Sequence, residues 1–151
     1  MTNYPETSEA FIEINAPIEQ VFSLVADLTR MGEWSPECFK LEWEGGSTRP
    51  ELGAKFRGHN RIGTSEWEEP GQIIDFESGR CIAFQVQQQS EHPSTWRFDF
   101  ESIGATTRVR ESFVVPVINV EGSGANFEGR FEMLHGAIET TLANIKAAAE
   151  A

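Results

Sequence analysis

The amino-acid sequence predicts an α+β fold in which a curved antiparallel sheet wraps around one long C-terminal helix. Three observations support this prediction. The middle of the chain holds many short segments in which apolar and polar residues alternate, as in half-buried strands. Short turns join these segments, which favours an antiparallel meander over βαβ units. The last segment is long and amphipathic with helical spacing, and a sheet is the only large surface on which it can pack.

The N-terminal part begins with a strand expected over residues 9–14. Asn15-Ala16-Pro17 ends this strand and starts a helix, because proline at the first helical position loses no hydrogen bond. A second short helix is expected between residues 27 and 36, where Pro36 closes it. The apolar face of the first helix is formed by Ile18, Val21, Phe22 and Val25.

The remaining strands follow from period-two alternation and from turn signals such as Ser78-Gly79, His92-Pro93 and Ile103-Gly104. They are expected over residues 39–44, 54–60, 63–68, 72–76, 81–88, 95–101 and 107–115. The alternation also predicts which side chains face the concave side of the sheet. These are Phe56, Gly58, Asn60, Phe84, Val86, Trp96, Phe98, Phe100, Thr107, Val109, Glu111 and Phe113.

The C-terminal helix is expected from Asn126 to about residue 149. Asn126 is the expected N-cap, and Glu128 lies in the first turn, where the helix dipole favours a negative charge. A helix of this length spans ~36 Å and crosses a whole small domain. Its apolar stripe consists of Phe127, Phe131, Leu134, Ile138, Leu142 and Ile145.

Length and charge narrow the classes of function. With 151 residues, the chain is expected to form one domain over residues 1–151. A net charge of −12 disfavours nucleic acid and anionic membranes as partners. We find no apolar run of ~18 residues and no signal-peptide pattern, so we expect a cytoplasmic protein without stable membrane insertion.

Metal and cofactor motifs are not found. Cys38 and Cys81 lack CxxC spacing and are expected to be buried free thiols. The histidines, His59, His92 and His135, show no metal-ligand spacing, so no metal is expected. The glycine-containing segment 122–127 lacks the third glycine and the βαβ context of a dinucleotide fingerprint, and no cofactor is predicted.

Several segments together resemble the START-like (SRPBCC) superfamily, in particular its polyketide cyclase/dehydrase-like branch. The similar segments are residues 12–22 with the Ala16-Pro17 helix start, residues 27–36 with Trp34 and Pro36, and residues 53–61 followed by Trp67. The resemblance covers nearly the whole chain and implies the helix-grip fold. Members of this superfamily bind lipids, sterols, polyketides, plant hormones or quinones, cyclise or dehydrate aromatic polyketides, or bind chaperones.

In such a fold, a pocket is expected between the concave face of the sheet and the stripe of the helix. Trp34 and Trp67 either line this pocket or its mouth, or belong to ordinary core packing. The residues predicted to bind a ligand are Trp34, Phe56, Asn60, Trp67, Phe84, Trp96, Phe98, Val109, Phe131 and Leu134.

Polar residues next to apolar neighbours supply the candidates for chemistry. Asn60 either binds a ligand through its amide or satisfies a backbone group. Glu111 either acts as a general acid or base or pairs with an arginine. His135 lies ~60° from the centre of the helix stripe, either as a proton shuttle or as a half-exposed surface residue. Glu111 and His135 are therefore the predicted catalytic residues.

The first functional hypothesis is a protein that binds a hydrophobic small molecule, such as a lipid, quinone or polyketide, through burial of apolar surface. An alternative is a polyketide cyclase or dehydratase that moves protons with Glu111, His135 or Asn60. A further alternative is a protein-interaction module like the chaperone-activator branch. The sequence leaves open whether the protein is an enzyme and whether it is a monomer or a homodimer.

Overall fold

A seven-stranded antiparallel sheet and three α-helices make up the fold, in a computed structural model that describes residues 6–88, 92–116 and 129–151. The strands lie in the order β1-β7-β6-β5-β4-β3-β2, and neighbouring strands pair antiparallel. The elements in chain order are β1 (Glu6–Ile14), α1 (Ile18–Ala26), the 3-10 helix η1 (Leu28–Arg30), α2 (Met31–Trp34), β2 (Cys38–Glu44), β3 (Lys55–Ile62), β4 (Ser65–Glu77), β5 (Cys81–Val86), β6 (Ser94–Ile103), β7 (Thr106–Val115) and α3 (Arg130–Glu150).

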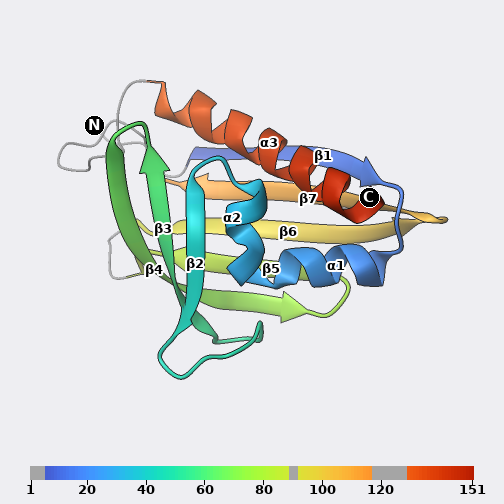
Figure 1. Ribbon diagram of the computed structural model, residues 1–151, viewed down its shortest axis with the longest axis horizontal. Coiled ribbons are helices and arrows are strands. Elements are labelled where there is room, and N and C mark those ends of the chain that lie inside the picture. Colours follow the sequence, from blue (N-terminus) through green and yellow to red (C-terminus); the bar gives the residue numbers. More distant parts are fainter. Residues whose placement is uncertain (1–5, 89–91, 117–128) are drawn as a thin grey trace.

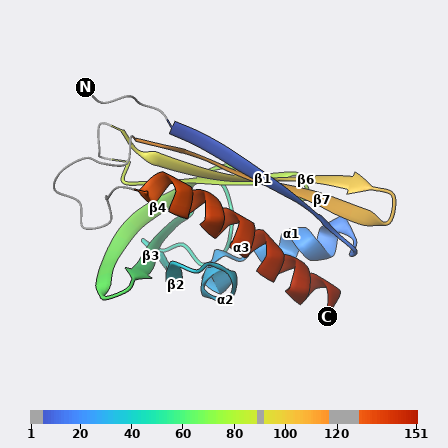
Figure 2. The ribbon, with the colours of Figure 1, turned by 90° about the horizontal axis from the view of Figure 1, so that it is seen from above.

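The sheet is strongly curved, and all helices lie on its concave side. In Figure 1, α3 crosses diagonally in front of β1 and β7, while α1 and α2 lie beside it. The view from above shows β2, β3 and β4 curling over toward the side on which α3 lies (Figure 2). α3 contacts β1, β7, α1 and α2. This arrangement confirms the predicted α+β fold, with a curved sheet wrapped around the C-terminal helix.

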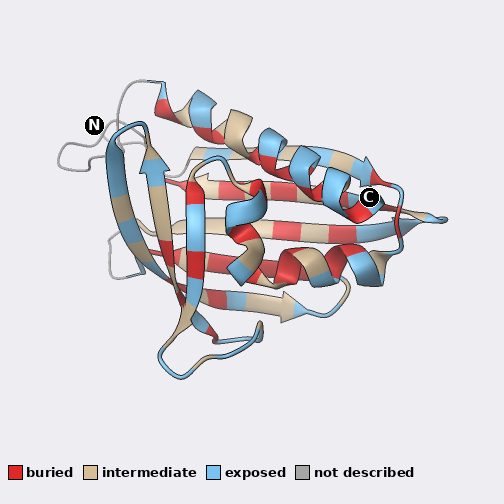
Figure 3. Ribbon diagram, viewed as in Figure 1, coloured by how far each residue is buried: buried red, intermediate tan, exposed pale blue. Residues whose placement is uncertain are grey.

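The core lies between the concave face and α3, and burial alternates along the strands (Figure 3). On β7, Thr107, Val109, Glu111 and Phe113 are buried, as the alternation predicted. On α3, the stripe residues Leu134, Ile138, Leu142 and Ile145 are buried against the sheet and the other helices. The expected helix start at Asn126, together with Phe127 and Glu128, lies outside the described residues.

The prediction of separate strands over residues 63–68 and 72–76 is wrong, because a single strand, β4, runs through both. The gap between the two expected strands falls on residues 69–71, yet Arg57 pairs with Pro70 and Phe56 with Gly71. Pro70 still accepts a hydrogen bond through its carbonyl, from the amide N–H of Gln87 at 3.4 Å. The strand therefore continues through the proline, whose only loss is one N–H donor.

The end of β5 and the orientation of β2 also differ from expectation. β5 ends at Val86 instead of residue 88, because Gln87 adopts a left-handed backbone conformation with φ 56°. In β2, the pairing register shifts between Cys38 and Lys40. This irregularity places both Cys38 and Leu41 in the core, whereas Phe39 is 41% exposed. In the sequence, Phe39 alternates with Leu41 and Trp43 in one apolar set, all of which a regular strand would place on the same face.

Cys38 and Cys81 are both buried and unbonded to one another, which confirms the prediction of free thiols. None of the helices in the described parts of the chain combines the length and the apolar character needed to cross a bilayer.

Candidate functional site

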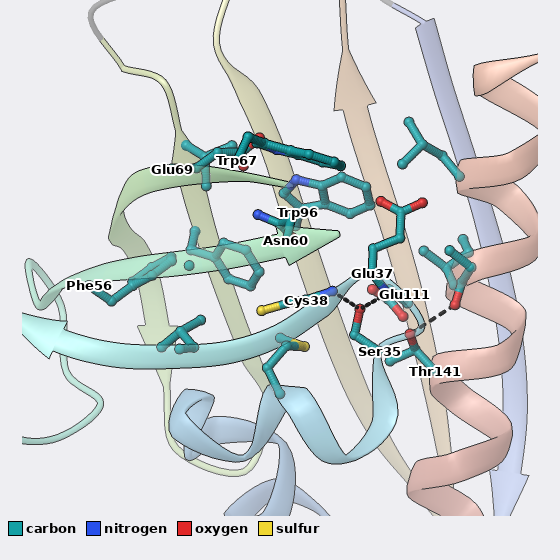
Figure 4. A pocket seen from close by; sticks show the side chains of 18 of the residues that line it. Ser35, Glu37, Cys38, Phe56, Asn60, Trp67, Glu69, Trp96, Glu111 and Thr141 are labelled. Carbon is teal, nitrogen blue, oxygen red and sulfur yellow. Dashed lines mark hydrogen bonds between the residues drawn. The ribbon is translucent and has the colours of Figure 1, made fainter. Parts of the chain in front are cut away.

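A cavity of about 120 Å³ lies between the curled end of the sheet, the junction of α2 with β2, and the first turns of α3. Figure 4 shows side chains from these elements pointing toward one space, among them Asn60, Trp67, Trp96 and Glu111. The curvature of the sheet creates this space, because the strands from β3 to β7 bend around it while α3 covers it.

Aromatic rings and aliphatic side chains form most of the wall. Phe56 on β3 and Phe84 on β5 meet edge to face, with ring centroids 5.4 Å apart. Trp67 on β4 and Trp96 on β6 add indole rings, and Leu134 covers the cavity from α3. Such walls favour an apolar ligand, and the few polar groups between them fix its orientation.

Glu111 is the most deeply buried acidic residue among the described residues that line the cavity. Its residue on β7 lies between Ala10 of β1 and Phe98 of β6, and it is 5% exposed. Within the described residues, its Oε1 atom has no hydrogen-bond partner. Burial raises the pKa of the Glu111 carboxyl well above its ordinary value of 4.5, because the charged form is poorly solvated there.

A second carboxyl group, Glu69, is held by a neighbouring ring. The Nε1–H of Trp67 donates a hydrogen bond of 2.8 Å to Glu69 Oε1, from two residues earlier on the same face of β4. Burial raises the pKa of Glu69, and the hydrogen bond from Trp67 and the charge of Arg130 only partly oppose this effect. Two of the carboxyl groups around the cavity are thus easier to protonate than a free glutamate.

The third carboxyl group, Glu37, forms an ion pair with Arg130 at the start of α3. The guanidinium donates two hydrogen bonds to Glu37, of 2.5 and 2.7 Å, and the two side chains are 7% and 11% exposed. Arg130 also lies over the ring of Trp67, with its Cζ atom 5.9 Å from the centroid. This ion pair joins α3 to the segment between α2 and β2 across one wall of the cavity.

The same segment is shaped by Ser35, whose Oγ accepts hydrogen bonds from the backbone N–H groups of Glu37 and Cys38 at 3.2 and 3.0 Å. The turn directs the Cys38 thiol to the cavity, and burial raises the pKa of this thiol to about 11. On α3, the Thr141 hydroxyl donates to the backbone carbonyl of Ala137 at 2.8 Å. These contacts fix polar groups on two walls of the cavity, the segment of residues 35–38 and α3.

The structure brings together most of the residues that the sequence singled out for the site. The predicted residues that line the cavity are Phe56, Asn60, Trp67, Phe84, Trp96, Glu111 and Leu134. Trp34, Phe98 and Val109 are instead buried in the adjoining core. Phe131 packs against Phe113, with ring centroids 5.8 Å apart.

His135 lies on a different side of α3. A hydrogen bond of 2.6 Å joins its Nδ1 atom to the hydroxyl of Ser8 on β1, and its Nε2 atom is 3.8 Å from Glu139. The His135 side chain is 39% exposed and faces the outer seam between α3 and β1. It is therefore not brought together with Glu111.

Several polar lining residues were not predicted from the sequence, namely Ser35, Glu37, Cys38, Glu69, Arg130 and Thr141. A signal existed for Glu69, because it shares a strand face with Trp67. No local signal identifies Glu37 and Arg130, which lie 93 positions apart in the chain and meet only in the folded structure.

The site combines aromatic walls with the Glu111 carboxyl, whose Oε1 atom has no partner among the described residues, with the Glu69 carboxyl bonded to Trp67, and with the Glu37–Arg130 ion pair. Such a site can hold an apolar molecule, form a hydrogen bond with it, and transfer a proton to or from it. Within the described ranges, no group of three or more His, Cys, Asp or Glu residues is arranged to hold a metal ion.

Comparison with known structures shows the same fold. The Zhui aromatase/cyclase from Streptomyces sp. R1128 is similar with a TM-score of 0.74 at 16% identity, covering 97% of this chain and 94% of that one. Major latex-like protein 151 from Panax ginseng gives a TM-score of 0.72 at 10% identity, covering 97% and 99%. The di-domain ARO/CYC StfQ from the steffimycin biosynthetic pathway gives 0.75 at 13% identity.

The match to StfQ covers 97% of this chain but 51% of that protein, so the chain spans about half of its length. No curated protein sequence matches the chain. The model of the family described as polyketide cyclase/dehydrase and lipid transport matches residues 5–150. This match covers nearly the whole chain and agrees with the curved sheet and the long C-terminal helix. The chain therefore belongs to the polyketide cyclase/dehydrase and lipid transport family.

Proposed function

We propose that this protein binds a small, largely apolar molecule in the cavity between the sheet and α3. The aromatic wall formed by Phe56, Phe84 and Trp96 supplies the apolar contact surface. Burial of a ligand there gains ~25 cal/mol for each Å² of apolar surface that leaves water. The polar groups between the rings then select a ligand with at least one polar atom.

The observation that carries this proposal is the Oε1 atom of Glu111 in the cavity wall, which has no hydrogen-bond partner among the described residues. A buried polar atom without a hydrogen-bond partner costs ~1–3 kcal/mol. A core with no function would avoid this cost by placing an apolar residue at position 111. A ligand that offers Glu111 a hydrogen-bond partner recovers this free energy on binding. The residue therefore supports a binding site at this position.

The size of the cavity bears on the ligand. About 120 Å³ is less than the ~300–1,000 Å³ of typical small-molecule sites. It approaches the ~150 Å³ of an engineered cavity that binds benzene. We therefore expect one aromatic ring or a short alkyl chain to fill the cavity, and any longer lipid, quinone or polyketide to extend beyond it.

Native mass spectrometry of the purified protein, followed by denaturing extraction, tests this function. A co-purifying apolar molecule is the expected result. Thermal stabilisation by at least one compound from a panel of lipids, quinones and aromatic polyketides would support the same conclusion. An empty protein that no compound stabilises would contradict it and favour the protein-interaction alternative.

Acid–base catalysis of a cyclisation or dehydration is the second candidate, and the raised pKa values of Glu111 and Glu69 favour it. A carboxyl group whose pKa lies closer to neutrality both donates and accepts protons more readily at that pH. Several structural neighbours are aromatase/cyclases by name. Turnover of an aromatic polyketide separates the candidates, because a protein that only binds shows none, whereas an enzyme that uses the Glu111 carboxyl shows turnover that Glu111→Gln abolishes.

A further inference from the structure

We propose that the molecule bound in this cavity carries a positive charge, as an amine attached to an apolar or aromatic body, and that its ammonium group lies against Glu111. This inference rests on the proposed function, since it names the chemical class of the ligand for the same cavity. It is carried by the Glu111 Oε1 atom, which has no partner among the described residues, by the excess of acidic over basic groups in the wall, and by the aromatic rings beside them.

The charges of the wall are unbalanced. The titratable residues that line the cavity are Glu37, Cys38, Glu69, Glu111 and Arg130. Arg130 is the only basic one among the described lining residues, and both of its hydrogen bonds to an acid go to Glu37. When all three carboxyl groups are ionised, the single positive charge of Arg130 leaves two negative charges without a basic partner in the wall.

Glu111 is the carboxyl group of the cavity for which the surrounding elements provide the fewest hydrogen-bond donors. Glu69 already accepts a hydrogen bond from Trp67. Around Glu111, β1 contributes Ala10 and β6 contributes Phe98, neither of which carries a donor in its side chain. On α3, the Thr141 hydroxyl donates its hydrogen bond to the backbone carbonyl of Ala137, and His135 is hydrogen-bonded to Ser8. A ligand ammonium would supply the donor that these elements do not provide.

The aromatic wall suits the same kind of ligand. The negative face of an indole or phenyl ring attracts a cation within ~6 Å of its centroid. Trp67 already shows this geometry in the protein, with the Arg130 guanidinium 5.9 Å from its ring. Trp96, Phe56 and Phe84 line the cavity as well. The combination of rings with an unpaired carboxyl is the pattern by which proteins recognise ammonium groups.

An anion fits this wall poorly. It would add a further negative charge beside Glu37, Glu69 and Glu111, and the single guanidinium is already paired. The net charge of −12 also favours the approach of cations over anions. A neutral molecule with a carbonyl oxygen is the remaining rival, because a protonated Glu111 can donate a hydrogen bond to it.

The two ligand classes differ in their proton balance. A cation stabilises the ionised carboxylate, so an amine that binds beside a protonated Glu111 drives that proton into solution. Its affinity therefore rises with pH until the carboxyl is ionised in the empty protein. A carbonyl ligand needs the proton to stay, so its affinity falls over the same range.

Isothermal titration calorimetry with a matched series of probes tests the inference. The series is 2-phenylethylamine, 2-phenylethanol and phenylacetate, which share a ring and differ in charge. The amine keeps its charge below pH ~10, as lysine does, so titrations at about pH 6 and about pH 8 report the protein's protons. Two buffers with different ionisation enthalpies give the number of protons released. The proteins are wild type, Glu111→Gln and, as a control, Glu101→Gln, which removes an exposed charge from β6.

We expect the amine to bind wild type about tenfold or more tightly than the alcohol, as a charge-assisted hydrogen bond implies, and phenylacetate to bind least. Proton release should accompany amine binding. Glu111→Gln should reduce the preference for the amine to about threefold or less, and Glu101→Gln should leave it unchanged. The proton count in wild type supports the same conclusion without any substitution.

The failures are distinguishable. If the alcohol binds as tightly as the amine, or if Glu111→Gln leaves the preference for the amine unchanged, the ligand class is wrong while the binding function stands. If none of the probes binds, the proposed function of the cavity fails, and the inference fails with it.

Discussion

The ring of Phe56 on β3 lies directly against the backbone of Gly71 on β4. A Cβ atom at Gly71 would stand 2.3 Å from Cζ of that ring, far inside van der Waals contact. Glycine at this position therefore lets a fully buried aromatic ring cover the strand, in the curled part of the sheet. The same ring forms a wall of the cavity, so a residue outside the lining determines where that wall stands.

Gly71→Ala should displace Phe56 and destabilise the protein by ~1–3 kcal/mol, as overpacking of a core does. Chemical denaturation measures this change. Gly136→Ala is the matched control, because a Cβ there meets nothing within 4 Å and alanine favours a helix by ~0.5–1 kcal/mol. Equal stability of Gly71→Ala and wild type would show that the contact does not constrain the ring.

Arg130→Gln should destabilise the protein by about 3 kcal/mol, because it leaves the Glu37 carboxylate buried without its partner. Additional replacement by Glu37→Gln should recover part of the loss, which a double-mutant cycle measures as coupling. Arg80→Gln serves as the control, since Arg80 and Glu77 are 74% and 58% exposed and such pairs contribute little. A loss no larger than that of the control would contradict a structural role for the ion pair.

Glu111→Gln should change how stability depends on pH. The folded protein holds a proton on Glu111 more tightly than the unfolded chain does, because burial raises the pKa of this carboxyl above 4.5. Wild type should therefore lose stability as pH rises from about 4.5 toward the raised pKa. Glutamine does not titrate, so the variant lacks this pH-dependent contribution to the free energy of unfolding. Its stability relative to wild type should therefore increase over that interval. Denaturation curves across pH measure the difference, and parallel profiles would contradict the assignment.

The Cys38 thiol should resist alkylation in the folded protein. With a pKa of about 11, roughly one thiol in a thousand is ionised at pH ~8, and only the thiolate is reactive. Iodoacetamide followed by mass spectrometry should show slow labelling of Cys38 that accelerates in denaturant. A ligand in the cavity should slow it further. Labelling as fast as in the unfolded chain would contradict the burial of this thiol.

The sheet and the helix stripe could be predicted from the sequence because both depend on local periodicity. The apolar residues that recur with the period of a strand or a helix are the ones that the fold buries. Alternation along residues 107–113 was sufficient to identify Glu111 as an inward residue, and β7 buries it. Alternation failed where the backbone departs from a regular strand. The register shift after Cys38 leaves Phe39 on the exposed face, and the gap expected over residues 69–71 is part of a continuous β4.

The polar half of the site was harder to predict, because it depends on contacts between distant segments. Glu37 and Arg130 form their ion pair only when α3 packs beside the segment that precedes β2, so neither residue is recognisable from its neighbours in the sequence. His135 was expected near the cavity from its angle on the helix, yet the rotation of α3 against β1 directs it to Ser8. An angle on a helix is informative only once the neighbouring element is known.

Occupation of the cavity between the sheet and α3 by a small apolar molecule can be observed directly by NMR. Each of the four tryptophans gives its own indole N–H signal. Trp67 and Trp96 line the cavity, whereas Trp34 and Trp43 pack elsewhere in the core. Titration with 2-phenylethylamine and with 2-phenylethanol should shift the signals of Trp67 and Trp96 and leave those of Trp34 and Trp43 in place. Unchanged signals with both compounds, or equal shifts of all four, would contradict binding in this cavity.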